Sequence, residues 1–175
     1  EKSKNETYRF QRLYRNLYNP DFYWLAYQNI YANTGSMTAG ADGTSIDGMS
    51  DERIEGIIES LRNRSYQPKP AKRVYIEKKN SNKKRPLGIQ SGNDKLVQEV
   101  VKMILESIYE PVFSNKSHGF RPNRSCQTAL MQIQRTFTGA NWFVEGDIHA
   151  CFDSFDHHVI VRLLTKRIDD EAFIQ

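Results

Sequence analysis

Apolar and polar residues alternate along the 175-residue chain in patterns that predict helices, one hairpin and one late strand. Apolar residues at three- and four-residue spacing indicate a helix, and bulky apolar runs or strict alternation indicate a strand. Asp21, Ser50, Ser125 and Asp156 are each expected to cap a following helix, because short polar side chains accept hydrogen bonds from a helix's first N–H groups. Helices are predicted over residues 8–18, 22–33, 51–64, 94–109, 126–137 and 159–164.

Two basic segments in the middle of the chain predict a β-hairpin. Residues 73–78 and 85–89 flank the polar turn 79–84. Pro86 has no N–H to donate into a central ladder, so the pair is expected at a sheet edge or as a ribbon. A protruding ribbon with cations on both arms suits phosphate binding better than it suits a core.

Composition limits the class of protein. Apolar residues make up 38% of the chain, enough for one domain or part of a larger one. No apolar run is long enough to span a membrane, and the N-terminus has no apolar leader, so no membrane partner is expected. The two cysteines, Cys126 and Cys151, form neither a disulfide framework nor a zinc signature. We expect a reducing compartment and a cytoplasmic protein.

Charge is concentrated in the middle of the chain. Residues 61–124 carry 15 basic and 5 acidic side chains, a net charge of +10, whereas residues 1–60 and 125–175 each have a net charge of −3. A clustered positive charge of this kind is typical of nucleic-acid partners. The alternative is a solvated lysine-rich face.

The stretch from Asn141 to His157 has the most distinctive chemistry. Trp142 to Val144 are bulky residues that fit a buried strand. Asp147 then stands near the expected end of this strand, where burying a carboxylate is costly unless a cation or donor is near. One interpretation is a metal site, and the other is a strand, turn and helix whose aspartates serve as turn and cap residues.

This stretch resembles the first catalytic motif of reverse transcriptases, in the form carried by group II intron-encoded maturases. The motif is Asp147-Ile148 followed by an aromatic residue, Phe152. Three further segments match the same family in the same order, with Ala41 in place of Val and Glu77 in place of the usual Pro. They are Gly40-Ala41-Asp42-Gly43-Thr44-Ser45-Ile46, the hairpin segments Lys72–Lys78 and Lys84–Ile89, and His118-Gly119-Phe120-Arg121-Pro122-Asn123-Arg124-Ser125.

The resemblance implies an α+β fold: the fingers and an incomplete palm of a reverse transcriptase. N-terminal helices would be joined by the fingers β-hairpin and the first palm strand. We expect an N-terminal helical extension over residues 1–38, fingers over residues 39–124 and the start of the palm over residues 125–175. The family's Tyr-x-Asp-Asp motif does not occur in the sequence. We therefore expect a fragment that does not polymerise alone.

The resemblance also implies roles for individual residues. Asp147 would be catalytic and would bind Mg²⁺ together with the carbonyl of Ile148. Lys78 and Arg85 would grip the triphosphate of the incoming deoxynucleotide, and Phe152 would lie under its sugar. Arg121 and Arg124 are read either as RNA-binding or as loop caps. The remaining RNA-binding residues are expected to be Lys69, Lys72, Arg73, Lys79, Lys83 and Lys84.

The expected partners are group II intron RNA, an RNA template with a DNA primer, and dNTPs, with a homodimer left open. The expected activity of the complete enzyme is RNA-directed DNA polymerisation together with intron binding and splicing assistance. Two alternatives stay open from the sequence. One is an RNA-binding splicing maturase without polymerase activity, and the other is a reverse transcriptase of the retron or defence type.

Overall fold

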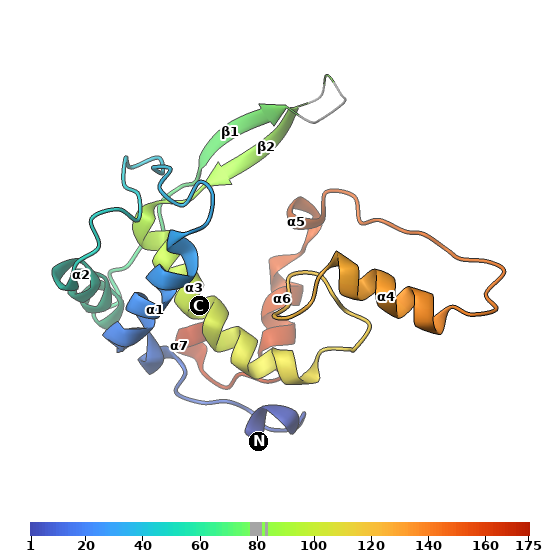
Figure 1. The fold of residues 1–175 in the computed structure, drawn as a ribbon. Helices are drawn as coiled ribbons and strands as arrows, with labels where there is room; N and C mark the ends of the chain where they lie inside the picture. The colour runs from blue at the N-terminus through green and yellow to red at the C-terminus, as the bar shows by residue number, and fades with distance from the viewer. Residues whose placement is uncertain (78–81, 83) are drawn as a thin grey trace. The chain divides into compact units, whose positions relative to one another are not determined.

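The computed structural model describes residues 1–77, 82 and 84–175, and it combines short helices with one small sheet (Figure 1). Contacts divide the chain into two compact units, which we call the hairpin unit (residues 12–105) and the Asp147 unit (residues 1–11 and 106–175). The family-based boundaries at residues 38 and 124 stay a prediction. The elements are η1 (Lys2–Lys4), η2 (Tyr14–Tyr18), α1 (Pro20–Tyr31), α2 (Asp51–Arg62), β1 (Lys72–Glu77), β2 (Lys84–Ile89), α3 (Gly92–Tyr109), η3 (Glu110–Val112), α4 (Cys126–Thr136), α5 (Cys151–Ser154), α6 (His157–Leu164) and α7 (Glu171–Ile174).

The core of the hairpin unit forms where α1, α2 and α3 bury their apolar faces. On α2 the buried residues recur at helical spacing, which places them on a single face. Each side chain of this size contributes about 1.5–3 kcal/mol when it is fully buried. The buried apolar residues of the three helices within this unit are Tyr23, Ala26, Ile54, Ile57, Ile58, Leu61, Leu96, Val97, Val100 and Ile104.

Side-chain caps set the starts of α1 and α2. Ser50 accepts a hydrogen bond from the N–H of Arg53, which confirms the predicted cap of α2. The predicted Asp21 cap of α1 is wrong. Asn19 caps this helix by accepting from the N–H of Asp21, and Pro20 occupies the first helical position. Proline is suited to that position because its missing N–H has no partner there in any helix.

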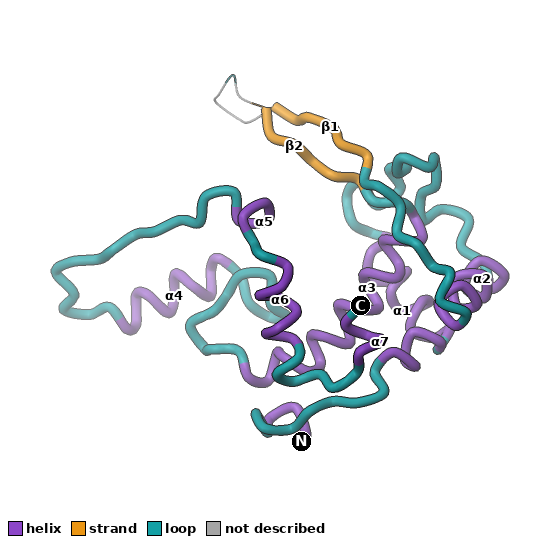
Figure 2. Tube along the Cα trace, turned by 180° about the vertical axis from the view of Figure 1, so that it is seen from behind, coloured by secondary structure: helices purple, strands orange, loops and turns teal. Residues whose placement is uncertain are grey.

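The predicted hairpin is confirmed. Strands β1 and β2 are antiparallel, with a register that runs from Lys72 opposite Ile89 to Glu77 opposite Lys84. Tyr75 lies opposite Pro86, so the proline sits on a two-stranded ribbon in which both strands are edges. Both views show the ribbon projecting away from α1, α2 and α3 (Figures 1 and 2).

The N-terminal segment of the Asp147 unit pairs with the segment that follows α6. The N–H of Phe10 donates to Arg167 O, and the N–H of Asp169 donates to Phe10 O, both at 2.7 Å. The predicted helix over residues 8–18 is therefore wrong. The backbone around Phe10 is extended and paired, and Arg12 has a positive φ of 58°. Of the predicted helix, only η2 is helical.

Two helices of the Asp147 unit, α4 and α6, begin at the predicted caps. Ser125 and Thr128 form a reciprocal capping box at the start of α4, and Asp156 accepts from the N–H of His158 at the start of α6. None of the described helices has the length and apolar character needed to cross a bilayer.

The first palm strand, which the sequence predicts around Asp147, does not form in the described residues. Residues 141–148 are a loop between α4 and α5 (Figure 2). The physical reason is pairing: an extended segment becomes a strand only when a neighbour takes its backbone hydrogen bonds. The structure describes one sheet, made of β1 and β2 alone, and neither strand pairs with residues 141–148.

Candidate nucleic-acid interface

The hairpin carries described cations on both of its faces. Side chains alternate along a strand, and directly opposite residues share a face. The register places Arg85 on the same face as Ile76 and Val74, which are half-buried. The other face carries Arg73, Tyr75 and Lys84, and Glu77 lies directly opposite Lys84.

The two faces have different chemistry. The Tyr75 ring is 60% exposed on the face that it shares with Arg73 and Lys84. Cations that flank an exposed aromatic ring suit a single-stranded nucleic acid, whose phosphates they attract and whose bases stack. Arg85 shares its face with Lys72, which lies opposite Ile89 at the base of the ribbon. Lys78, Lys79 and Lys83 lie outside the described residues.

A glycine-rich loop is packed tightly against the segment that follows the hairpin. A side chain at Gly92 would place its Cβ 1.9 Å from Ser45 O, and one at Gly40 would place its Cβ 2.7 Å from the Cα of Ser91. Both distances are far inside van der Waals contact, so only glycine fits. The glycine-rich loop spans residues 40–48 and contains the motif Asp42-Gly43-Thr44.

Arg53 of α2 links the glycine-rich loop to the start of α3 by hydrogen bonds. Its Nη2 donates to Ser45 O and its Nη1 to Asp47 O, both at 2.7 Å, while its Nε donates to Asn93 Oδ1 at 2.8 Å. The N–H of Thr44 donates to the carboxylate of Asp42, and this bond is the main reason that the pKa of Asp42 lies below its usual value. Loop, α2 and the start of α3 therefore form one connected base beneath the hairpin.

The residues predicted for catalysis lie in an exposed part of the Asp147 unit. Asp147 and Ile148 are in the loop before α5, and Phe152 of α5 is 88% exposed. Ala150, which precedes α5, has a left-handed backbone with φ of 47°. Phe152 is therefore not a core residue of the described chain.

The described residues do not complete a metal site. A two-metal site needs several carboxylates, and hard cations such as Mg²⁺ prefer oxygen ligands in a compact set. In the part of the chain that the structure describes, no three His, Cys, Asp or Glu residues are grouped in a way that would hold a metal ion. Asp147 on its own contributes one carboxylate.

The Arg121 guanidinium forms hydrogen bonds with groups of its own loop and of η3. Its Nε and Nη2 donate to the carboxylate of Glu110 at 2.8–3.1 Å, and its Nη1 donates to Ser114 O and Ser117 O. The hydrogen bonds between Arg121 and Glu110 raise the pKa of Arg121 and hold the pKa of the Glu110 carboxyl below its usual range.

The surroundings of the two loop arginines differ. The Arg121 side chain is buried, with its guanidinium 5.3 Å from the Phe113 ring centre. Of the two roles that the sequence leaves open for it, the geometry favours capping the loop. The Arg124 guanidinium donates to Asn115 at a long 3.5 Å, so among the described residues it is the more available of these two cations.

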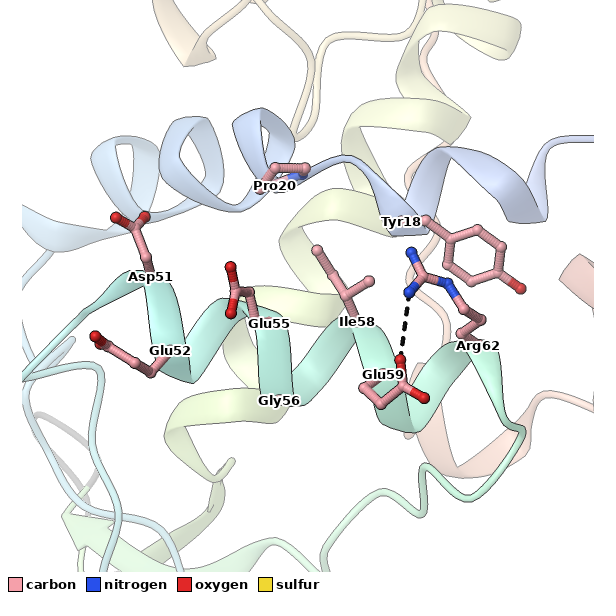
Figure 3. Close-up of a pocket in the computed structure, with 9 residues that line it drawn as sticks. All are labelled: Tyr18, Pro20, Asp51, Glu52, Glu55, Gly56, Ile58, Glu59 and Arg62. Carbon is pink, nitrogen blue, oxygen red and sulfur yellow. Dashed lines mark hydrogen bonds and ion pairs between the residues drawn. The ribbon is translucent and has the colours of Figure 1, made fainter.

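A hollow of about 790 Å³ along α2 is unsuited to nucleic acid (Figure 3). Arg62 is paired with Glu59 at 3.3 Å and offsets one of the four carboxylates that line the hollow, so the surface stays acidic. Phosphate would be repelled by this surface. The acidic residues that line the hollow are Asp51, Glu52, Glu55 and Glu59.

Residues 76–173, more than half of the chain, match the family described as reverse transcriptase (RNA-dependent DNA polymerase). The chain belongs to the reverse transcriptase family.

Several of its relatives are proteins encoded in introns or named as intron maturases. The chain is 56% identical over 166 residues to the group II intron-encoded protein LtrA of Lactococcus lactis, covering 95% of the chain and 28% of LtrA. It is 47% identical to a 91 kDa protein in the cob intron of Schizosaccharomyces pombe, covering 92% of the chain and 20% of that protein. Identity to nuclear intron maturase 1 of Arabidopsis thaliana is 43% over 81 residues, 46% of the chain and 11% of the maturase. The resemblance to group II intron reverse transcriptases and maturases is confirmed.

The reverse transcriptase match contains all the residues predicted to bind metal or dNTP and some of those predicted to bind RNA. Arg85, Arg121, Asp147 and Phe152 fall inside it, whereas Lys69, Lys72 and Arg73 precede it. The chain spans at most 28% of the length of the three relatives described above. The roles of single residues therefore stay proposals.

Two residues of this reverse transcriptase chain escaped prediction from the sequence. Glu110 is the partner of Arg121, and Asp94 is a buried carboxylate at the start of α3. Glu110 had no local signal. Asp94 had one, because Ser91 followed three residues later by Asp94 has the spacing of a capping box.

Proposed function

We propose that the chain acts as the fingers and part of the palm of an RNA-directed DNA polymerase encoded by a group II intron, which also binds the intron RNA and assists its splicing. The observation that carries the proposal is the reverse transcriptase match over residues 76–173, which includes both Arg85 and Asp147. The identity to LtrA supports the intron setting.

The hairpin is assigned to nucleotide and RNA binding. Lys78 and Arg85 would hold the triphosphate of an incoming dNTP, since a lysine offers a mobile point charge and an arginine a planar fork of donors. Lys69, Lys72, Arg73, Lys79, Lys83 and Lys84 would attract the phosphates of an RNA template and a DNA primer. Arg124 would add a further cation, and Arg121 would act by holding the loop beside it.

Asp147 is assigned to metal binding in the complete polymerase. Its carboxylate and the Ile148 carbonyl would be oxygen ligands of Mg²⁺. The bound ions would activate the primer hydroxyl and stabilise the leaving pyrophosphate. Phe152, five residues further on, would lie under the sugar of the dNTP and exclude a 2′-hydroxyl.

The experiment is Asp147→Asn in a complete polymerase that contains this chain. The substitution is nearly isosteric and removes the charge, so primer extension should fall roughly 1,000-fold, equivalent to about 4 kcal/mol of transition-state stabilisation. RNA binding measured in parallel should change less than about threefold, because phosphate contacts supply its affinity.

Asp156→Asn is the matched control. Asp156 is a helix cap, and asparagine caps a helix about as well as aspartate, so extension should be retained. Undiminished extension by the Asp147→Asn enzyme would remove Asp147 from the active site.

A second candidate function is supported by the relative from Arabidopsis thaliana, which is named a maturase. In this case the protein would bind intron RNA and support splicing without cDNA synthesis. Splicing that proceeds normally while the unmodified protein shows no primer extension would favour this second function over the first.

A further inference from the structure

The two ends of the hairpin meet at one buried carboxylate, that of Asp94. Lys69, just before β1, donates its backbone N–H to Asp94 Oδ2 at 2.9 Å. Ser91, just after β2, donates its hydroxyl to the same oxygen at 2.9 Å. Asp94 is 2% exposed, and the hydroxyl of Tyr66 donates to its other oxygen.

These donors explain how the carboxylate is accommodated. A buried ionised carboxylate is costly unless hydrogen bonds replace its lost water. Burial, and then the bond to Asp94, raise the pKa of Tyr66, so the phenol keeps its proton and remains a donor. Each of the three donors comes from a different position around the base of the hairpin, so one side chain joins the segments that enter and leave it.

The hairpin depends on this base for its direction. An isolated two-stranded ribbon is at best marginally stable, and no third strand pairs with β1 or β2 in the described residues. On the other side of Ser91 lies Gly40, too close to allow a side chain. Ser91 is thus held between the glycine-rich loop and Asp94, and the ribbon extends from a point that has little freedom to shift.

We propose that Asp94 is a positioning residue for nucleotide binding, which aims the hairpin so that Arg85 meets the triphosphate of the incoming nucleotide. This inference rests on the proposed polymerase function. Asp94 touches neither the nucleotide nor the reacting atoms. It acts through the hairpin, by fixing Lys69 and Ser91 relative to each other.

The same helix supplies a matched control. Glu99 of α3 is also a buried carboxylate, 8% exposed, and accepts hydrogen bonds from Lys102 and Asn29. Neither of these two partners lies in the hairpin or in the segments beside it. Asp94→Asn and Glu99→Gln therefore make the same chemical change on one helix, and only the first touches the base of the hairpin.

The test uses steady-state primer extension by a complete polymerase containing this chain, with the dNTP varied, well below the melting temperature of each variant. Asparagine turns one acceptor oxygen into an NH₂ group that faces donors, so Asp94→Asn should loosen the base. We expect the KM for dNTP to rise about tenfold or more, because small displacements of a binding group have large kinetic effects. The kcat and the affinity for primer–template should change less than about threefold.

Two milder changes keep the test decisive if Asp94→Asn folds poorly. Tyr66→Phe and Ser91→Ala each remove one donor and should raise the same KM by smaller factors. Hydrogen exchange of the β1 and β2 amides should be faster in all three variants. Glu99→Gln should lower the thermal stability while leaving the KM for dNTP and the hydrogen exchange of the hairpin amides unchanged.

Arg85→Ala separates the possible failures. If Arg85→Ala itself leaves the KM for dNTP unchanged, the assignment of the hairpin to nucleotide binding fails. If Arg85→Ala raises the KM but Asp94→Asn behaves like Glu99→Gln, the positioning role of Asp94 is wrong. If both raise it, combining them should give less than the product of the two effects, since both act on one contact.

Discussion

The base of the hairpin and the segment before Asp147 differ in how well they are packed. In the hairpin unit, the segments before and after the hairpin are bound to Asp94, which is 2% exposed. In the Asp147 unit, Trp142 in the loop that leads to Asp147 is 92% exposed. The first arrangement is complete within residues 12–105, because Asp94, Arg53 and the close-packed glycines all find partners there. The second has hydrogen bonds and packing at its helix caps but none described along residues 141–148. The residues proposed to bind nucleotide are thus positioned by contacts within their own unit. In the described residues, the segment that carries the proposed metal ligand has no neighbouring strand.

The contrast has a physical cause. In a β-hairpin the backbone groups that face the partner strand form hydrogen bonds with it, and a short loop brings the two strands together. A single extended segment has no such means. Its apolar side chains also need a surface to cover them, and exposed groups of apolar residues commonly mark interaction surfaces.

The largest expected effect that tests this contrast concerns Phe152. In a complete polymerase, Phe152→Val should raise kcat/KM for rNTP relative to dNTP roughly 30- to 1,000-fold, which corresponds to relief of a clash worth about 2–4 kcal/mol. Because Phe152 is exposed, the same change in the 175-residue chain should leave its melting temperature nearly unchanged. An unaltered nucleotide ratio accompanied by a lower melting temperature would make Phe152 a packing residue.

The next effect concerns the packed base of the hairpin unit. Gly92→Ala should destabilise the chain by about 1–3 kcal/mol, the usual cost of overpacking, because a Cβ at Gly92 would collide with Ser45 O. Urea unfolding measures the change. Gly56→Ala on α2 is the control: no atom lies within 4 Å of its Cβ position, so it should stabilise the helix by roughly 0.5–1 kcal/mol. Equal effects of the two substitutions would contradict the close packing.

A smaller effect should distinguish the exposed cations. Lys84→Ala should lower the slope of log affinity against log salt for single-stranded RNA by about 1, as expected when one phosphate contact is lost. Arg121→Ala should leave the slope nearly unchanged, since Arg121 is already paired with Glu110. The measurement is a binding titration at several salt concentrations. A reduced slope for Arg121→Ala alone would reverse the roles assigned to these two residues.

The smallest effect is a pH dependence of the loop in the Asp147 unit. The pKa of Glu110 is lowered in the folded chain by its hydrogen bonds from Arg121, relative to a usual value of 4.5. Its contribution to stability is therefore fully present above pH 4.5 and is lost as the pH falls through the lower folded value. The difference in unfolding free energy between the natural chain and Glu110→Gln should shrink below pH 4.5. A difference that stays constant across this range would remove the ion pair as its cause.

Local signals in the sequence predicted the hairpin and the caps at Ser50, Ser125 and Asp156. Each of these features depends on residues within a few positions of one another, so the sequence contains all the interacting groups. The Asn19 cap was missed by two positions because two polar residues flank Pro20 and both can cap. The family match and the identity of the motif residues were likewise available from the sequence.

The sequence by itself determined the family, the ribbon and the starts of α2, α4 and α6, because these follow from short-range hydrogen bonding and from the order of motifs. Only the tertiary structure decided that Phe10 pairs with the segment after α6, that Glu110 engages Arg121 and that Asp94 joins both ends of the hairpin. These contacts link groups far apart in sequence or choose among several donors. Their energies depend on burial, which no local pattern of residues specifies. For the same reason the strand expected before Asp147 could not be judged from its residues, because a strand exists only where a second segment pairs with it.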